Sequence, residues 1–308
     1  MITSQTGARW LREDFLWSKI EPSPGRFDFS YFDHFMLLAS RKGVHVLPLL
    51  DGTPAWAGAH WNTIPSDPST YARFVAAVVG RYGPHGSFWA QHPELRAYAI
   101  QTYELWNEPY FDNGNAGHYD PARYAALVKA AASAGRAVDP SAKYLLEAEI
   151  TGRQIGSKWV SWIDALYQAA PDLNNYFDAI AIHPYGRDTT GLSDHGWGQM
   201  RRTEVLRNAF VSHGAADKPL WITEVGWPTC TQGSDRCVHG SQQAASITAL
   251  FNYLHTTWAT YVKAAFIYHY EDFGRDASNS ENDYGLTHAD HTPKPALNIF
   301  KAQARGSA

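Results

Sequence analysis

Two glutamates stand in short segments that suggest chemistry rather than packing. Glu108 belongs to Trp-Asn-Glu-Pro at 106–109, and Glu224 belongs to Trp-Ile-Thr-Glu-Val-Gly-Trp at 221–227. Both follow apolar or β-branched runs typical of buried strands, where an acid without a partner is costly to desolvate. They are 116 residues apart in the chain, so only a fold in which strand ends converge could bring them together. Two carboxylates that flank a glycosidic bond are what glycoside hydrolysis requires.

Seven apolar runs predict β-strands, and helical patterns separate them. The stretch at 67–83 shows the helical signals clearly, with Asp67 as N-cap, Pro68 at the first helical position and Gly83 at the end. Strands that alternate with helices predict parallel pairing and right-handed crossovers. No long linker interrupts the alternation, so we expect a single domain over residues 1–308. The predicted strands are 9–15, 44–50, 98–106, 143–149, 178–183, 219–225 and 264–270.

Two architectures fit this alternation, an open doubly wound sheet and a (β/α)8 barrel. No glycine-rich nucleotide-binding turn follows any predicted strand, which disfavours the open sheet. Nearly every predicted strand instead ends in polar or aromatic residues, which is the pattern of barrels that carry an active site at their strand ends. The fold class predicted is therefore an α/β, (β/α)8 TIM-type barrel. Only seven strands are found, so the barrel is expected to lack its first β-strand and helix, through truncation or an unusual closure.

The sequence resembles the clan A glycoside hydrolases, in particular families 5 and 39. The resemblance rests on the Asn-Glu-Pro motif at 107–109, predicted to end the fourth barrel strand, and on the Thr-Glu pair at 223–224, predicted to end the seventh. It implies a retaining enzyme that cleaves β-glycosidic bonds by double displacement. Glu108 would be the acid/base and Glu224 the nucleophile. No cofactor is expected, and the chain has no clustered metal-binding motif.

Polar residues near the two glutamates are expected to support them. Asn107 is expected to hold the 2-hydroxyl of the sugar or the nucleophile. Arg12 is expected to keep Glu224 ionised, because a nearby cation favours the charged form of a carboxyl group. The alternative is a salt bridge between Arg12 and Glu13 or Glu104. Glu104 lies four residues before Glu108, too deep to reach a substrate, and is assigned to a buried network with an arginine.

Further substrate contacts are expected from the ends of other strands. His183 and Tyr185 alternate onto one strand face and are expected to orient Glu224 or the substrate. Three aromatic rings could equally be packing residues or platforms on which a sugar stacks. These rings are Trp56, Trp227 and Tyr268, the last standing where many clan members carry tryptophan.

The same motifs are compatible with two other functions. A transglycosylase would use the same two glutamates with a sugar hydroxyl in place of water. A non-catalytic carbohydrate-binding barrel would retain the fold without turnover. Endo action on a polysaccharide is mildly preferred because aromatic-rich loops suit extended clefts, but the sugar and its linkage are not specified by the sequence. The motif Gly-Trp-Pro-Thr at 226–229 also occurs in family 17 β-1,3-glucanases, whose acid motif differs from this one.

Composition and cysteine content indicate which binding partners and which cellular compartment to expect. The net charge is −4, which gives no reason to expect nucleic acid or an anionic membrane surface as a partner. No apolar run reaches the ~18 residues that a membrane span requires. Cys230 and Cys237 lie in one polar loop and are either free thiols or a disulfide, which would imply an oxidising compartment. We therefore expect a monomer that binds carbohydrate and is secreted, its leader absent from this sequence.

Overall fold

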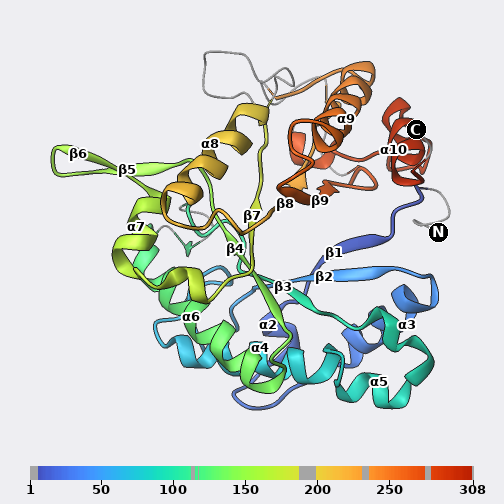
Figure 1. Cartoon of the computed structure of the whole chain (residues 1–308). Coiled ribbons are helices and arrows are strands. Elements are labelled where there is room, and N and C mark those ends of the chain that lie inside the picture. Colours follow the sequence, from blue (N-terminus) through green and yellow to red (C-terminus); the bar gives the residue numbers. More distant parts are fainter. Residues whose placement is uncertain are drawn as a thin grey trace. The chain divides into compact units, whose positions relative to one another are not determined.

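The computed structural model describes residues 6–111, 115–116, 118–186, 199–230, 236–274 and 279–306 (Figure 1). The chain forms two compact units. We call residues 10–181 with 209–218 the β1–β7 unit, and residues 1–9, 182–208 and 219–308 the β8–β9 unit. The seven strands of the main sheet follow chain order, β1-β2-β3-β4-β7-β8-β9. The single domain expected over residues 1–308 stays a prediction.

The β1–β7 unit contains the first five strands of this order, apart from Ile182 at the end of β7. All four pairings between neighbours are parallel, and Glu104 of β3 lies opposite Leu49 of β2 and Leu145 of β4. Each strand lies within a run that the sequence analysis identified, although β3 is shorter than its run. The strands are β1 (Trp10–Asp14), β2 (His45–Leu50), β3 (Thr102–Leu105), β4 (Lys143–Glu147) and β7 (Ala179–Ile182).

Helices follow the strands of this unit, as the alternation predicted. Asp67 caps α4 by accepting a hydrogen bond from the Ser69 amide at 2.9 Å, and Pro68 begins the helix. Asp120 caps α6 through the Arg123 amide at 2.9 Å. The helices are α2 (Trp17–Ile20), α3 (Ser30–Arg41), α4 (Pro68–Tyr82), α5 (Ser87–Gln91), η1 (Pro93–Tyr98), α6 (Pro121–Val138), α7 (Trp162–Ala169) and η3 (Leu173–Asn175), and α8 (Gln199–Ser212) is divided between the two units.

A β-hairpin between β4 and α7 was not predicted. It consists of β5 (Gly152–Ile155) and β6 (Lys158–Ser161), paired antiparallel, and projects away from α7 in Figure 1. Its turn is Gly156-Ser157, with Gly156 at φ +61°, a conformation that glycine adopts readily. The sequence pattern missed it because its strands are short and mostly exposed, so they lack the apolar run that marks a buried strand.

The β8–β9 unit carries the other two strands, β8 (Leu220–Val225) and β9 (Val262–Ile267), which pair in parallel. Its further elements are α9 (Gly240–His255), η4 (Ser280–Asn282) and α10 (Pro295–Ala304). Among the described residues seven strands therefore make up the main sheet, and the eighth strand of a complete barrel is missing, as expected. No helix in this described part of the chain is both long and apolar enough to span a membrane.

A buried lysine ties the loop after β8 to the segment before α10. The Lys294 ammonium donates to Asp272 Oδ1 at 2.7 Å, to Thr229 Oγ1 at 2.7 Å and to the Asp283 carbonyl at 3.0 Å. Burial lowers the pKa of Lys294, and the hydrogen bond to Asp272 counteracts this. These three hydrogen bonds hold the loop that follows Glu224. Truncating one member of the Lys294–Asp272 pair would leave a buried charge uncompensated.

Cys230 and Cys237 form a disulfide, which confirms one of the two alternatives for these residues. The bridge closes a short loop directly after Thr229, a partner of the Lys294 ammonium. A disulfide stabilises the folded state mainly by restricting the unfolded chain, and for a loop of this length the chain-entropy model gives about 2–3 kcal/mol.

Replacing both cysteines with serine is expected to lower the free energy of unfolding by about 2–3 kcal/mol. Chemical denaturation followed by tryptophan fluorescence measures this change. A reductant should destabilise the wild-type protein by a similar amount and leave the double variant unaffected. Identical denaturation midpoints for the two proteins would show that the bridge contributes nothing.

Candidate active site

The backbone turns sharply after β3, in the residues that lead to Glu108. Trp106 has φ +72° and Glu108 has φ +47°, a region that residues with a side chain rarely adopt. Hydrogen bonds to β2 stabilise the turn. The Leu50 carbonyl accepts from the Trp106 amide at 3.1 Å and from the Tyr71 hydroxyl at 2.5 Å. The Trp106 ring packs edge-on against Tyr71 at 5.7 Å. This turn fixes where the Glu108 side chain leaves the backbone.

A second, fully buried glutamate anchors Glu108. Glu147, at the end of β4, accepts a hydrogen bond from the Glu108 amide at 2.6 Å and another from the Tyr110 hydroxyl at 3.0 Å. Tyr124 completes the link, since its hydroxyl donates to Leu105 O at 2.9 Å and accepts from the Glu147 amide at 2.9 Å. Burial and the charge of Glu147 hold the pKa of Tyr110 well above its usual value, so its hydroxyl remains a donor.

Sequence reasoning missed Glu147. Glu147 lies inside the predicted strand 143–149, two residues before its end, and no motif marks it. The structure gives it a positioning role through the backbone of Glu108.

Arg12 connects the interior of the unit to Asn107. Its Nε pairs with Glu104 Oε2 at 2.5 Å, and its Nη2 donates to Asn107 Oδ1 at 3.0 Å. The buried network of Glu104 with an arginine is thus confirmed. Because Arg12 engages the amide oxygen of Asn107, the Nδ2 group of that side chain is oriented as the donor. The expected action of Arg12 on Glu224 stays a prediction.

Two buried acids of the β1–β7 unit, Glu104 and Glu147, lie close enough together to be considered as metal ligands. Glu104 and Glu147 bring carboxylate oxygens within 4.8 Å of each other, close enough to share an ion. Arg12 already binds Glu104, while the Glu108 amide and the Tyr110 hydroxyl bind both oxygens of Glu147. A metal ion that used Glu147, or Oε2 of Glu104, would have to displace these contacts, so these oxygens fit hydrogen bonding better than metal coordination.

In the β8–β9 unit, Glu224 lies near the end of β8 with two aromatic partners. The Tyr185 hydroxyl donates to Glu224 Oε2 at 2.8 Å, and His183 Nδ1 lies 3.8 Å from the same oxygen. His183 Nε2 lies 3.1 Å from Thr223 Oγ1, which orients the imidazole ring. Burial and the negative charge of Glu224 keep the pKa of Tyr185 well above its usual value. Tyr185 therefore stays protonated and donates to the Glu224 carboxyl group.

Replacing Tyr185 with phenylalanine is expected to lower kcat/KM by about 10- to 100-fold, the worth of one hydrogen bond to a charged group. The acid limb of the pH profile should also move to higher pH, because the lost donor favoured the ionised form of the carboxyl group. The measurement is the pH dependence of hydrolysis of an aryl β-glycoside.

Tyr253→Phe, on α9 of the same unit, is the matched control and should leave the profile unchanged. An unaltered acid limb in Tyr185→Phe would assign this tyrosine a packing role only.

The loop after Glu224 is shaped by a close backbone approach. A Cβ atom on Gly226 would lie 2.1 Å from the Tyr268 carbonyl oxygen, so only glycine fits there. Tyr268 itself is partly exposed, and its ring contacts Tyr185 at 6.3 Å and Tyr284 at 5.5 Å. These contacts place Tyr268 in the same aromatic cluster as the tyrosine that binds Glu224.

The two tryptophans considered as sugar platforms or packing residues differ in exposure. Trp227 is only 1% exposed, so it offers no ring face to a sugar, and packing is the role that its burial supports. Its carbonyl accepts a hydrogen bond from the Gln243 side chain at 3.0 Å. Trp56 is partly exposed, and its Nε1 donates to the Glu21 carbonyl at 3.0 Å while its ring lies edge-on to Trp17 at 5.4 Å.

The predicted site residues thus form two local groups. Arg12, Asn107 and Glu108 belong to the β1–β7 unit, and His183, Tyr185, Glu224 and Tyr268 belong to the β8–β9 unit. Each group surrounds one glutamate at or beyond the carboxyl end of a strand. The separation of the two carboxyl groups stays a prediction, with about 5–5.5 Å expected for a retaining enzyme.

Comparison with known proteins identifies similar folds among glycoside hydrolases. The family model of glycoside hydrolase family 42, beta-galactosidase, matches residues 2–116. No curated protein matches the chain in sequence. A family 39 glycoside hydrolase from the gut symbiont Bacteroides cellulosilyticus WH2 has a similar fold, with a TM-score of 0.74 and 20% identity over 99% of this chain and 59% of that chain.

Two further solved structures extend the similarity. A monomeric beta-xylosidase from Caulobacter crescentus CB15 has a TM-score of 0.69 and 17% identity, covering 98% of this chain and 62% of that chain. Native xylanase 10B from Thermotoga maritima has a TM-score of 0.62 and 16% identity, covering 97% of this chain and 86% of that chain. The chain thus spans about 60% of the length of the family 39 hydrolase and the xylosidase. The predicted (β/α)8 TIM-type fold is confirmed, and so is the resemblance to clan A glycoside hydrolases.

Proposed function

We propose that the chain is a retaining glycoside hydrolase that cleaves β-glycosidic bonds, with Glu224 as nucleophile and Glu108 as acid/base. The observation that carries this proposal is the setting of Glu224. Its carboxylate lies near the end of a parallel strand and receives a hydrogen bond at 2.8 Å from a tyrosine that burial keeps protonated. The similarity to a family 39 glycoside hydrolase and a beta-xylosidase supports the same chemistry.

The reaction proposed has two displacements. Glu224 attacks the anomeric carbon as the glycosidic C–O bond breaks, and Glu108 gives its proton to the leaving oxygen. A covalent glycosyl-enzyme results. Glu108, now a carboxylate, then removes a proton from water, whose oxygen attacks the anomeric carbon and releases Glu224. Two inversions at one carbon give overall retention.

The groups around Glu108 suit this double role. The turn at Trp106–Glu108 and the bond from the Glu108 amide to Glu147 fix the backbone, while the side chain is partly exposed. Asn107, its oxygen held by Arg12, presents Nδ2 as a donor for the sugar 2-hydroxyl. Hydrogen bonds to this hydroxyl strengthen in the transition state and assist catalysis.

We also propose three finer features of the enzyme. Trp61, in the loop after β2, and Trp159, in β6 of the hairpin, are each 66% exposed and could line an extended cleft, which favours endo action on a polysaccharide. The Cys230–Cys237 disulfide favours a secreted enzyme, because such bonds persist in oxidising compartments. A monomer is proposed for the active species.

The stereochemistry of the product tests the proposed function. Hydrolysis of an aryl β-glycoside, followed by proton NMR from the first minutes, should release the β-anomer before mutarotation produces the α-anomer. First release of the α-anomer would show inversion and overturn the double displacement. Absence of turnover across a panel of aryl β-glycosides, with retained sugar binding, would favour a binding protein.

A further inference from the structure

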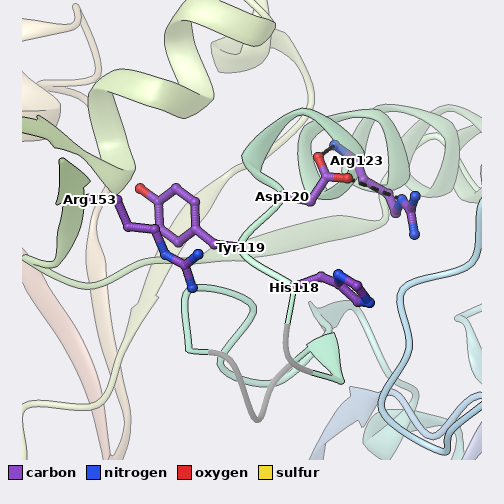
Figure 2. A pocket seen from close by; sticks show the side chains of 5 residues that line it. All are labelled: His118, Tyr119, Asp120, Arg123 and Arg153. Atoms are coloured by element: carbon purple, nitrogen blue, oxygen red, sulfur yellow. Dashed lines mark hydrogen bonds and ion pairs between the residues drawn. The ribbon is translucent and has the colours of Figure 1, made fainter. Parts of the chain in front are cut away.

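A pocket of about 310 Å³ lies in the β1–β7 unit, and all the residues that line it carry polar groups (Figure 2). Four of them come from the segment that leads from Glu108 into α6, and the fifth comes from β5 of the unpredicted hairpin. They are His118, Tyr119, Asp120, Arg123 and Arg153.

The pocket belongs to the same edge of the sheet as Glu108. Its two segments follow β3 and β4, which pair in parallel with Leu105 opposite Leu146, so both leave the sheet at its carboxyl edge. Ring contacts connect the pocket with the surroundings of Glu108, since the Trp162 ring lies 5.1 Å from that of Tyr119 and 6.3 Å from that of Tyr110. Tyr110 in turn donates to Glu147, which holds the Glu108 amide.

The lining offers mostly hydrogen-bond donors. The Arg153 guanidinium lies 4.5 Å over the Tyr119 ring, a cation–π contact that orients its N–H groups (Figure 2). Arg123 Nε lies 3.3 Å from Asp120 Oδ2, and both side chains are about one-third exposed, so this ion pair is weak. The Asp120 carboxylate is also engaged as the cap of α6. The one acid of the pocket therefore already has partners within the protein.

Tyr119 adds a further donor. Its hydroxyl is shielded from solvent and has no hydrogen-bond partner within the described residues. Burial raises the pKa of Tyr119 although Arg153 lowers it, so the hydroxyl remains protonated. His118 is exposed at the rim of the pocket and supplies a ring nitrogen.

We infer that this pocket is a subsite for an anionic group on the saccharide, either the carboxylate of a uronic acid or a sulfate ester. Guanidinium groups match both anions through paired N–H donors. The inference rests on the proposed function, because it names the substrate class of that site. It makes the enzyme one that prefers acidic over neutral saccharides.

Binding of small sugars to the protein tests the subsite without turnover. Dissociation constants for D-glucuronate, D-galacturonate, D-glucose 6-sulfate and D-glucose are measured by NMR titration. At least one anionic sugar is expected to bind about 10-fold tighter than glucose, the worth of one charge-assisted hydrogen bond. The uronates and the sulfate separate the two sources of the anion.

Substitutions of the two arginines test whether the anionic sugar binds in this pocket. Arg153→Gln and Arg123→Gln should each remove the preference for the anion, and Arg153→Lys should keep part of it. Arg73→Gln, an exposed arginine on α4 outside the pocket, is the matched control and should retain it. Thermal unfolding establishes that each variant is folded, and Arg123→Gln carries the test if Arg153→Gln is not. Equal binding of all four sugars, no binding of the anions, or an undiminished preference in both glutamine variants would overturn the inference.

The binding and hydrolysis measurements together distinguish failure of this inference from failure of the proposed function. Loss of anion selectivity with intact hydrolysis of neutral aryl β-glycosides would remove the subsite only. Anion binding that depends on Arg153, without hydrolysis of any glycoside, would remove the enzymatic proposal and keep the subsite.

Discussion

Replacing Glu224 with alanine is expected to lower kcat for aryl β-glycosides by on the order of 10⁴-fold or more, because the first covalent step loses its nucleophile. The Tyr185 hydroxyl and the His183 ring would then face a cavity, since both lie close to Oε2 in the wild-type protein. Substrate binding should survive, so KM or ligand affinity should change far less than kcat.

A small anion should restore part of this activity. Azide can enter the space left by the carboxylate and attack the anomeric carbon directly, so that a single inversion yields an α-glycosyl azide from a β-glycoside. Initial rates with and without azide, and the configuration of the product, are the measurements. Glu94→Ala, an exposed glutamate in η1, is the matched control. Retention of wild-type kcat by Glu224→Ala would remove Glu224 from the nucleophile role.

The strand positions were predictable because burial leaves a strong local signal. Apolar runs marked all seven strands of the main sheet, and Asp67-Pro68 marked the start of α4 within one residue. Glu108 and Glu224 stood out for the same reason, since acids at the ends of buried runs are costly unless paired or used. The pairing of Glu104 with an arginine followed from that cost.

Contacts between distant segments could not be predicted from local pattern. Glu147 holds the Glu108 amide across 39 positions of sequence, and only the register of β3 against β4 brings them together. The positive φ values of Trp106 and Glu108 depend on hydrogen bonds to Leu50 O and Glu147, not on residue preference. Burial of Trp227 likewise comes from tertiary packing, whereas composition left packing and sugar stacking equally open.

Replacing Glu108 with alanine should give a different pattern, because the acid assists departure of the leaving group. For substrates with poor leaving groups, kcat/KM should fall by about 10²- to 10⁴-fold, the usual contribution of general acid–base catalysis. Activated aryl glycosides need little protonation, so their first step should be affected much less. A series of aryl β-glycosides with leaving groups of graded acidity measures this dependence.

The pH profile supplies a second readout for Glu108. A general acid must be protonated, so wild-type activity is expected to fall as pH rises through the alkaline limb. In Glu108→Ala that limb should flatten for activated substrates, because no proton transfer from residue 108 remains. Glu94→Ala should keep both limbs. An unchanged limb together with a uniform loss for all leaving groups would assign Glu108 to binding instead.

Azide distinguishes the two glutamates within one experiment. In Glu108→Ala the nucleophile is intact, so the glycosyl-enzyme still forms from an activated substrate, and azide replaces water in the second step without needing a base. Two inversions then give a β-glycosyl azide, the opposite anomer from that expected with Glu224→Ala. Because the anomer depends on which displacement azide replaces, it reports the role of each residue independently of how far activity falls. The same anomer from both variants would contradict the assignment of one acid/base and one nucleophile.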